Sequence, residues 1–172
     1  MPKLSIIQVI LLLFVINLGI MIGGGVYEAL VLVPIWASAP PDSVLAFHQH
    51  GIANPEFVTH QGGKFWIFVT PMLGILSIAT ILSGFKANTH HRKWRIVGAT
   101  LSLVLIIFTF AWFIPNVLLL TGEEVTKMSR DRIVSLTNWW VGLNWLRAVI
   151  YVIAWVMGLR ALMIPAERAK VT

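Results

Sequence analysis

The stretch NWWVGLNWLRAVIYVIAWVMGLRAL, from Asn138 to Leu162, is almost wholly apolar and long enough to cross a lipid bilayer. It nevertheless carries Asn144 and Arg147 among its apolar residues. A charged side chain at the centre of a bilayer costs at least about 2.5–3.5 kcal/mol, so such residues generally face a partner or a cavity. The stretch therefore predicts a transmembrane helix that contributes to a site.

The composition of the whole chain points the same way. The sequence has 172 residues, of which 58% are hydrophobic and only 12% are charged, against roughly 25% charged residues in a typical soluble domain. Four apolar runs are separated by short polar connections, with spans at about 4–36, 65–85, 94–120 and 133–163. We therefore predict an all-α membrane protein: one domain over residues 1–172, folded as an antiparallel four-helix transmembrane bundle.

The basic residues predict how the bundle is oriented. The net charge is +6, and the cations cluster in the turn KANTHHRKWR at 86–95 and in the C-terminal RAKVT at 168–172. Short basic connections stay on the cytoplasmic side, so we expect both termini in the cytoplasm, most naturally across a bacterial inner membrane. Because the cations flank apolar spans, their partner is membrane lipid and no nucleic acid is expected.

Two longer connections then face outward, at 38–63 and 121–136. The first contains Trp36, Phe47, Ile52 and Phe57 in or beside it, and apolar side chains need cover. We therefore expect it to fold back over the mouth of the bundle.

Cysteine is absent, which excludes disulfides, thiolate metal ligands and thiol redox chemistry. All five histidines fall outside the spans, so a haem held between two transmembrane histidines is disfavoured. The motif HQH, with Glu56 and His60 nearby, offers zinc or copper ligands, but its spacing is generic. A solvated loop is the better interpretation, and no metal site is predicted; the histidines are His48, His50, His60, His90 and His91.

On the last span, polar and aromatic residues share one face. Trp140, Asn144, Arg147 and Tyr151 are spaced by four, three and four residues, which places them within an arc of about 60° on a helix. Arg147 lies about 20 Å from the inner end of this helix near Arg160, in the outer half of the membrane. This stripe either lines a pocket or packs the bundle while Arg147 extends toward the headgroups.

Polar residues on other spans could converge with this stripe. Asn17 and Glu28 lie on the first span and Asn116 follows Pro115 on the third, with Thr70 and Thr109 as milder candidates. Glu28 is the natural counter-charge for Arg147, although it lies about 37 Å along the first helix from Lys3. The preceding glycines at 23–25 either bend that helix or allow close helix contact. Of the eight tryptophans, those placed beside the pocket are Trp112 and Trp140.

These residues resemble the anthrone oxygenase-like family of small four-span membrane proteins. The resemblance rests on Pro115 and Asn116, on Trp140, Asn144 and Arg147, and on GVYEALVLVPIW near the end of the first span. Fungal members of this family oxidise polyketide anthrones to anthraquinones with O2 and use neither a metal nor an organic cofactor. Most bacterial members are uncharacterised.

The resemblance implies a set of roles for this chain. Asn116, Trp140, Asn144 and Arg147 would hold a phenolate-like substrate, with Arg147 stabilising the anion in a dry pocket and Glu28 taking the proton. Trp112, Tyr151 and Asn17 would complete the binding site, and no cofactor is expected. A histidine is common in that family where this chain has Asn144, so this chain lacks the obvious general base.

Two functions from different classes remain open. The protein binds or oxidises a lipophilic aromatic or quinone-like molecule, or it is a non-catalytic accessory or assembly subunit of a larger membrane complex or a homo-oligomer. A small transporter is disfavoured, because the sequence shows no inverted repeat and only one deep charge.

Overall fold

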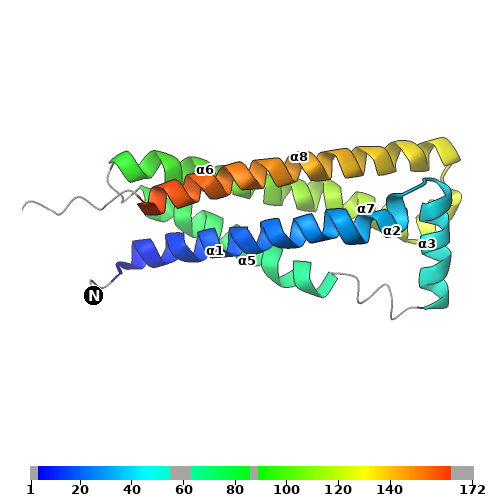
Figure 1. The fold of residues 1–172 in the computed structure, drawn as a ribbon, viewed down its shortest axis with the longest axis horizontal. Helices are drawn as coiled ribbons and strands as arrows, with labels where there is room; N and C mark the ends of the chain where they lie inside the picture. The colour runs from blue at the N-terminus through cyan, green and yellow to red at the C-terminus, as the bar shows by residue number, and fades with distance from the viewer. Residues whose placement is uncertain (1–3, 55–62, 86–88, 164–172) are drawn as a thin grey trace, which may run out of the picture.

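The computed structural model describes residues 4–54, 63–85 and 89–163, and nearly all of them are helical (Figure 1). Among these residues, four helices are long and apolar enough to cross a membrane. They comprise Ile6–Ala37, Gly63–Gly84, Arg92–Thr121 and Arg130–Met163. The structure thus confirms the all-helical prediction, and these four helices suggest an integral membrane protein.

The first long helix contains one widened turn. It consists of α1 (Ile6–Tyr27), the π-helical turn η1 (Glu28–Leu32) and α2 (Val33–Ala37). Pro34 has no backbone N–H, and its ring would collide with the carbonyl group four residues earlier in a regular α-helix. The turn before it is therefore wider, and the N–H of Val33 donates to the carbonyl of Glu28 five residues back. Glu28 begins this turn.

The third long helix repeats the same arrangement. It is built from α6 (Thr89–Phe108), the π-helical turn η2 (Thr109–Phe113) and α7 (Ile114–Thr121). Here Pro115 follows the widened turn, and the N–H of Ile114 donates to the carbonyl of Thr109. Such turns are often found at functional sites, and both of them lie beside the cavity described below.

The other two long helices are α5 (Gly63–Gly84) and α8 (Arg130–Met163). The helix α5 packs between α1 and α6, and α8 packs on the opposite side against the same two helices. With 22 residues against 34 in α8, α5 is the shorter helix and accompanies the bundle over only part of its length (Figure 1). The remaining part is formed by α1 with η1 and α2, by α7 and by α8.

A short helix, α3 (Asp42–Ala53), crosses one end of the bundle (Figure 1); we call this end the α3 end. The sequence predicted an outer loop here, and its described part is instead a helix. It covers the bundle as expected, with Val44 buried and an ion pair of 2.7 Å joining Asp42 to Arg130 at the start of α8. Ile52 is 65% exposed, so the expectation that its side chain is covered was wrong. Phe57 lies outside the described residues.

The interpretation of His48 as a solvated loop residue was also wrong. His48 is buried on α3, and its Nδ1 lies 3.1 Å from the carbonyl oxygen of Thr121 at the end of α7. On a helix His48 and His50 are about 200° apart, so they cannot bind one metal ion together. Glu56 and His60 lie outside the described residues. The second connection forms a short 3-10 helix, η3 (Glu123–Lys127), before α8 begins.

The helices α6 and α8 lie in close contact at Gly98. A side-chain carbon at this position would lie 3.0 Å from the carbonyl oxygen of Ala154 and 3.2 Å from the Cβ of Met157. Small residues allow this kind of backbone contact between membrane helices. On α1, a Cβ at Gly24 would lie 2.5 Å from the ring of Phe65 on α5, so this glycine leaves room for a side chain. A Cβ at Gly23 or Gly25 would meet nothing within 4 Å, and α1 continues through all three glycines.

We predict that Gly98→Val destabilises the bundle by about 1–3 kcal/mol, the usual cost of overpacking, because the obstacle is rigid backbone. The matched control is Gly142→Val on α8, where an added Cβ meets nothing within 4 Å. Thermal unfolding of the detergent-solubilised variants measures the difference. Equal melting temperatures for the two variants would contradict the close contact at Gly98.

Candidate functional site

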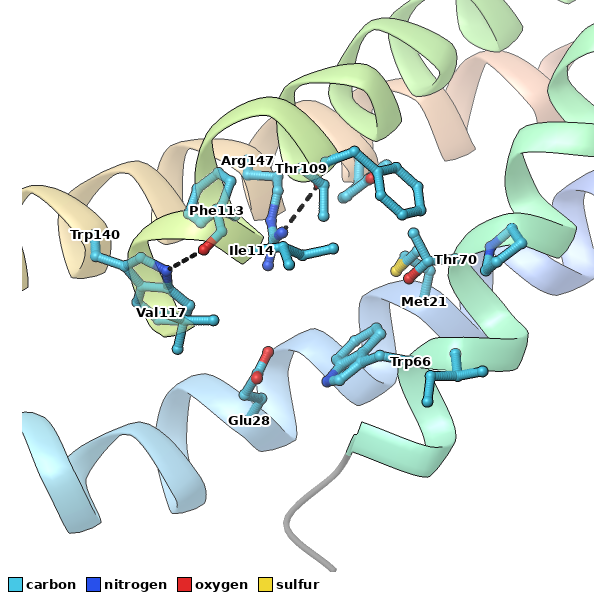
Figure 2. Close-up of a pocket in the computed structure, with 14 residues that line it drawn as sticks. Met21, Glu28, Trp66, Thr70, Thr109, Phe113, Ile114, Val117, Trp140 and Arg147 are labelled. Atoms are coloured by element: carbon cyan, nitrogen blue, oxygen red, sulfur yellow. Dashed lines mark hydrogen bonds between the residues drawn. The ribbon is translucent and has the colours of Figure 1, made fainter. Parts of the chain in front are cut away.

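A cavity of about 340 Å³ lies between the two apolar clusters of the bundle. One cluster joins α1, α5, α6 and α8 and contains Leu18, Leu73 and Ala154. The other lies toward the α3 end and contains Trp36, Val44 and Leu120. The wall of the cavity draws on both clusters and is mostly apolar, with contributions from Met21, Ile67, Phe113, Ile114, Val117 and Trp140 (Figure 2).

Arg147 projects from α8 into this cavity (Figure 2). Its guanidinium donates one hydrogen bond to the hydroxyl of Thr109 at 3.2 Å and another to the side-chain oxygen of Asn144 at 2.5 Å. It also lies over the ring of Phe113, 4.2 Å from the ring centre, where a cation is attracted to the π face. Three contacts therefore fix the cation between α8 and the widened turn η2.

The partners of Arg147 are themselves held in place. The hydroxyl of Thr109 donates to the carbonyl of Leu105 at 2.8 Å, so its oxygen lone pairs are left to accept from Arg147. Asn144 is buried one helical turn before Arg147 on the same face of α8. Tyr151, one turn further along, is buried and also lines the cavity. The predicted polar stripe of the last span therefore faces inward.

Glu28 stands on another wall of the cavity, at the start of the widened turn η1 (Figure 2). Its carboxylate is half-buried, and the side chain of Trp66 on α5 lines the cavity beside it (Figure 2). Within the described residues the ion pairs are Lys127 with Glu124 and Arg130 with Asp42, so Glu28 and Arg147 are not in direct contact. The cavity therefore presents two opposite charges with space between them.

Trp140 closes the cavity toward the α3 end. Its indole N–H donates to the carbonyl of Phe113 at 3.2 Å, and its ring meets Trp36 and Phe113 edge to face, with ring centres 5.2 and 5.6 Å apart. This arrangement fixes a buried aromatic wall across three long helices. Trp140 therefore packs the bundle together at this level and also lines the cavity.

The cavity opens through the side of the bundle. Ile67 on α5 and Phe110 on η2 both line it, yet they are 67% and 52% exposed. The exposed side of the cavity lies between these two helices, near the start of the short helix α5. In a bilayer, exposed side chains on that side of a helix bundle would face the acyl chains.

The structure brings together most of the residues proposed from the sequence. Glu28, Trp140, Arg147 and Tyr151 line the cavity together with Thr70 and Thr109, and Asn144 supports Arg147. Asn17 is half-buried on α1 and is not part of the lining; its side-chain oxygen is buried without a hydrogen-bond partner.

Asn116 and Trp112 lie elsewhere. They line a separate hollow between α7 and α8, and the amide of Asn116 donates to the carbonyl of Trp112 at 2.7 Å. The reason is geometric: Phe113 and Val117 face the cavity, and residues one position earlier on the same helix are turned away by about 100°. Sequence proximity to Pro115 did not reveal this rotation.

Trp66 and Phe113 are the site residues that the sequence did not reveal. Trp66 resembles any interfacial anchor, and Phe113 resembles any apolar residue of a span. The available signal was the pair Pro34 and Pro115, because a proline inside a span removes a backbone hydrogen bond and disturbs the turn before it; Pro71 in α5 shows that the turn does not always widen. The turns before Pro34 and Pro115 contain Glu28, Thr109 and Phe113.

We predict that Asn144→Leu lowers the free energy of unfolding by about 1–3 kcal/mol, the typical cost of leaving a buried polar partner unsatisfied. Leucine fills the space but removes the acceptor from Arg147. The control is Asn138→Leu on the same helix, where the side chain is exposed. Chemical unfolding in detergent, followed by tryptophan fluorescence, compares the two; similar losses would show that Asn144 does not support Arg147.

Comparison with known proteins finds no match: no protein-family model, no curated protein and no solved structure is detectably similar to this chain.

Proposed function

We propose that this protein binds a lipophilic, ring-containing molecule that carries hydroxyl or keto oxygens and reaches the cavity from the bilayer. The observation that carries the proposal is the pair of opposite charges, Glu28 and Arg147, on the wall of an otherwise apolar cavity. Charged side chains at such depth are costly, and they generally mark a site.

The size and walls of the cavity support a ligand of this kind. A volume of about 340 Å³ lies at the lower end of the roughly 300–1,000 Å³ range of small-molecule sites. Flat aromatic surfaces from Trp66, Phe113 and Trp140 suit a planar ring system. The side opening between Ile67 and Phe110 suits a molecule that partitions into lipid.

Arg147 supplies recognition of a ligand oxygen. A guanidinium has five N–H donors, and the two hydrogen bonds to Thr109 and Asn144 occupy two of them. The remaining donors can bind a keto oxygen or a phenolate. Since the guanidinium is already oriented by protein contacts, little ordering is needed when the ligand binds.

Glu28 supplies the complementary group, because a carboxylate accepts a hydrogen bond from a hydroxyl. A ring with an acidic hydroxyl near Glu28 and an oxygen near Arg147 satisfies both charges at once. Quinols and hydroxylated ring ketones have this pattern. A plain hydrocarbon or an alkyl chain leaves both charges without a partner in an apolar cavity, which is unfavourable.

The resemblance to the anthrone oxygenase-like family adds a reaction to this binding site. In that reaction a ring CH2 group becomes a carbonyl: one atom of O2 enters the carbon skeleton and the other leaves with the two hydrogens as water. The amide of Asn144 cannot act as a base. Glu28, the carboxylate on the cavity wall, is therefore the proposed proton acceptor. Arg147 would stabilise the resulting enolate or phenolate.

The arrangement in the membrane is proposed as antiparallel, with both termini cytoplasmic in a bacterial inner membrane. Its support is the clustering of cations at 86–95 and 168–172. In Figure 1 the first turns of α1 and the last turns of α8 also lie at the same end of the bundle, opposite the α3 end. On this proposal the cavity lies in the outer half of the membrane.

The alternative is an accessory subunit of a larger membrane complex. This alternative would explain why the chain has Asn144 at the position where the similar family commonly has a histidine. It requires no ligand. The two proposals differ in what occupies the cavity, so ligand binding by the purified protein separates them.

We predict that 1,5-dihydroxynaphthalene binds to the purified protein and quenches the fluorescence of the cavity tryptophans, while naphthalene binds at least 10-fold more weakly. Arg147→Leu should weaken the binding of the dihydroxy compound about 10- to 100-fold, the equivalent of the roughly 1.5–3 kcal/mol of a hydrogen bond to a charged group. Arg147→Lys should recover little, since lysine lacks the planar fork.

The matched control is Arg160→Leu. Arg160 is also on α8 and also lies 4.2 Å from the centre of an aromatic ring, that of Trp94, but it does not line the cavity. The Arg160→Leu variant should bind the dihydroxy compound with the same affinity as the unmodified protein. Equal affinity for naphthalene and its dihydroxy derivative would exclude the polar recognition, and co-purification with a large complex would then favour the accessory subunit.

We also predict that a reporter fused after Thr172 reports a cytoplasmic location, and that a reporter inserted at Gln49 on the exposed face of α3 reports the opposite side. Paired phosphatase and fluorescent-protein fusions measure both positions. A periplasmic signal from the C-terminal fusion would overturn the orientation without affecting the cavity.

A further inference from the structure

A second hollow, of about 480 Å³, lies between α7 and α8 on the outside of the bundle. It is separate from the cavity that contains Glu28 and Arg147, because the two share no lining residue. Trp112 and Asn116 form one side, and α8 forms the other. The residues from α8 that the argument uses are Arg132, Ser135, Trp139 and Leu143.

The hollow changes from polar to apolar along the helices. Arg132 and Ser135 lie near the start of α8, at the α3 end, and Leu143 lies about 16 Å further along the helix. On the facing side, Asn116 lies one turn nearer the α3 end than Trp112. Both walls therefore run from polar groups at the α3 end to apolar groups toward the middle of the bundle.

The charged group at the polar end has no acidic partner in the described part of the chain. Arg130, two residues earlier, pairs with Asp42 at 2.7 Å, whereas the guanidinium of Arg132 makes no ion pair there. Asn116 uses one amide hydrogen on the carbonyl of Trp112 and keeps a second. One full positive charge and neutral donors thus meet at the rim of the hollow.

We propose that this hollow binds one phospholipid, with its phosphate at Arg132, Ser135 and Asn116 and an acyl chain along Trp112 and Leu143. A phosphodiester carries a single negative charge, which one arginine balances. Trp139 is 64% exposed at the boundary between the two parts of the hollow, where tryptophans commonly lie at the level of lipid headgroups. This inference is independent of the proposed function of the inner cavity.

The polarity gradient argues for a lipid over other ligands. A free phosphate ion would not require the apolar part of the hollow, and a hydrocarbon would not require Arg132. Basic pockets between membrane helices bind lipid headgroups on the cytoplasmic side of membranes, and Arg132 offers the same charge at the α3 end. A phospholipid is the ligand whose charge and chain follow the same order as the lining residues.

The test is lipid retention by the full-length protein, measured by native mass spectrometry after delipidation in detergent and addition of phosphatidylglycerol. The unmodified protein should retain one lipid molecule. Arg132→Gln should retain at most about one tenth as much, whereas Arg130→Gln, the matched control, should retain it fully. Diacylglycerol, which has the same chains but no phosphate, should not be retained.

A second variant, Trp139→Ala, tests the apolar part of the hollow. It removes a side chain that is 64% exposed and therefore contributes little to the core. It should release the lipid faster than the unmodified protein, while the two proteins should have the same melting temperature after delipidation. Equal retention by Arg132→Gln and Arg130→Gln would overturn the proposal, and so would retention of diacylglycerol. Displacement of the lipid by millimolar inorganic phosphate would show a phosphate site and exclude a lipid site.

Discussion

The charge of Arg147 is the constraint on which the site depends. A cation within an apolar bundle must be given acceptors by the protein, because lipid offers none. Asn144 comes from the same helix, but Thr109 and the ring of Phe113 come from η2. The contacts of the Arg147 guanidinium with these partners therefore fix the distance and rotation between α8 and the third long helix at this level.

Two prolines, Pro34 and Pro115, shape the helices around this charge. Pro34 and Pro115 each follow a widened turn, and the wider turns place Glu28, Thr109 and Phe113 around one space. The shortness of α5 then leaves this space open at the side, between Ile67 and Phe110. A fully regular bundle with four equal helices would close the cavity with side chains. Irregular helix geometry and unequal helix length thus create room for a ligand.

The inner cavity and the outer hollow between α7 and α8 differ in the chemistry that they offer. The inner cavity carries charges of both signs among aromatic walls, which suits a small planar molecule with two oxygen functions. The outer hollow carries one cation at its rim above an apolar floor, which suits a lipid. The residues Asn116 and Trp112 belong to the outer hollow, so only the inner group of the sequence-proposed residues bears on the proposed function.

The sequence by itself determined that the protein is helical, that four helices can span a membrane, and that Trp140, Asn144, Arg147 and Tyr151 share one helix face. Length, hydropathy and a period of 3.6 residues suffice for these properties because they are local. Only the tertiary structure decided that Glu28 and Trp66 face that stripe, that Asn116 turns away from it, and that His48 is buried on the crossing helix α3. These depend on helix rotation, widened turns and helix length, which are fixed by contacts between segments far apart in the chain.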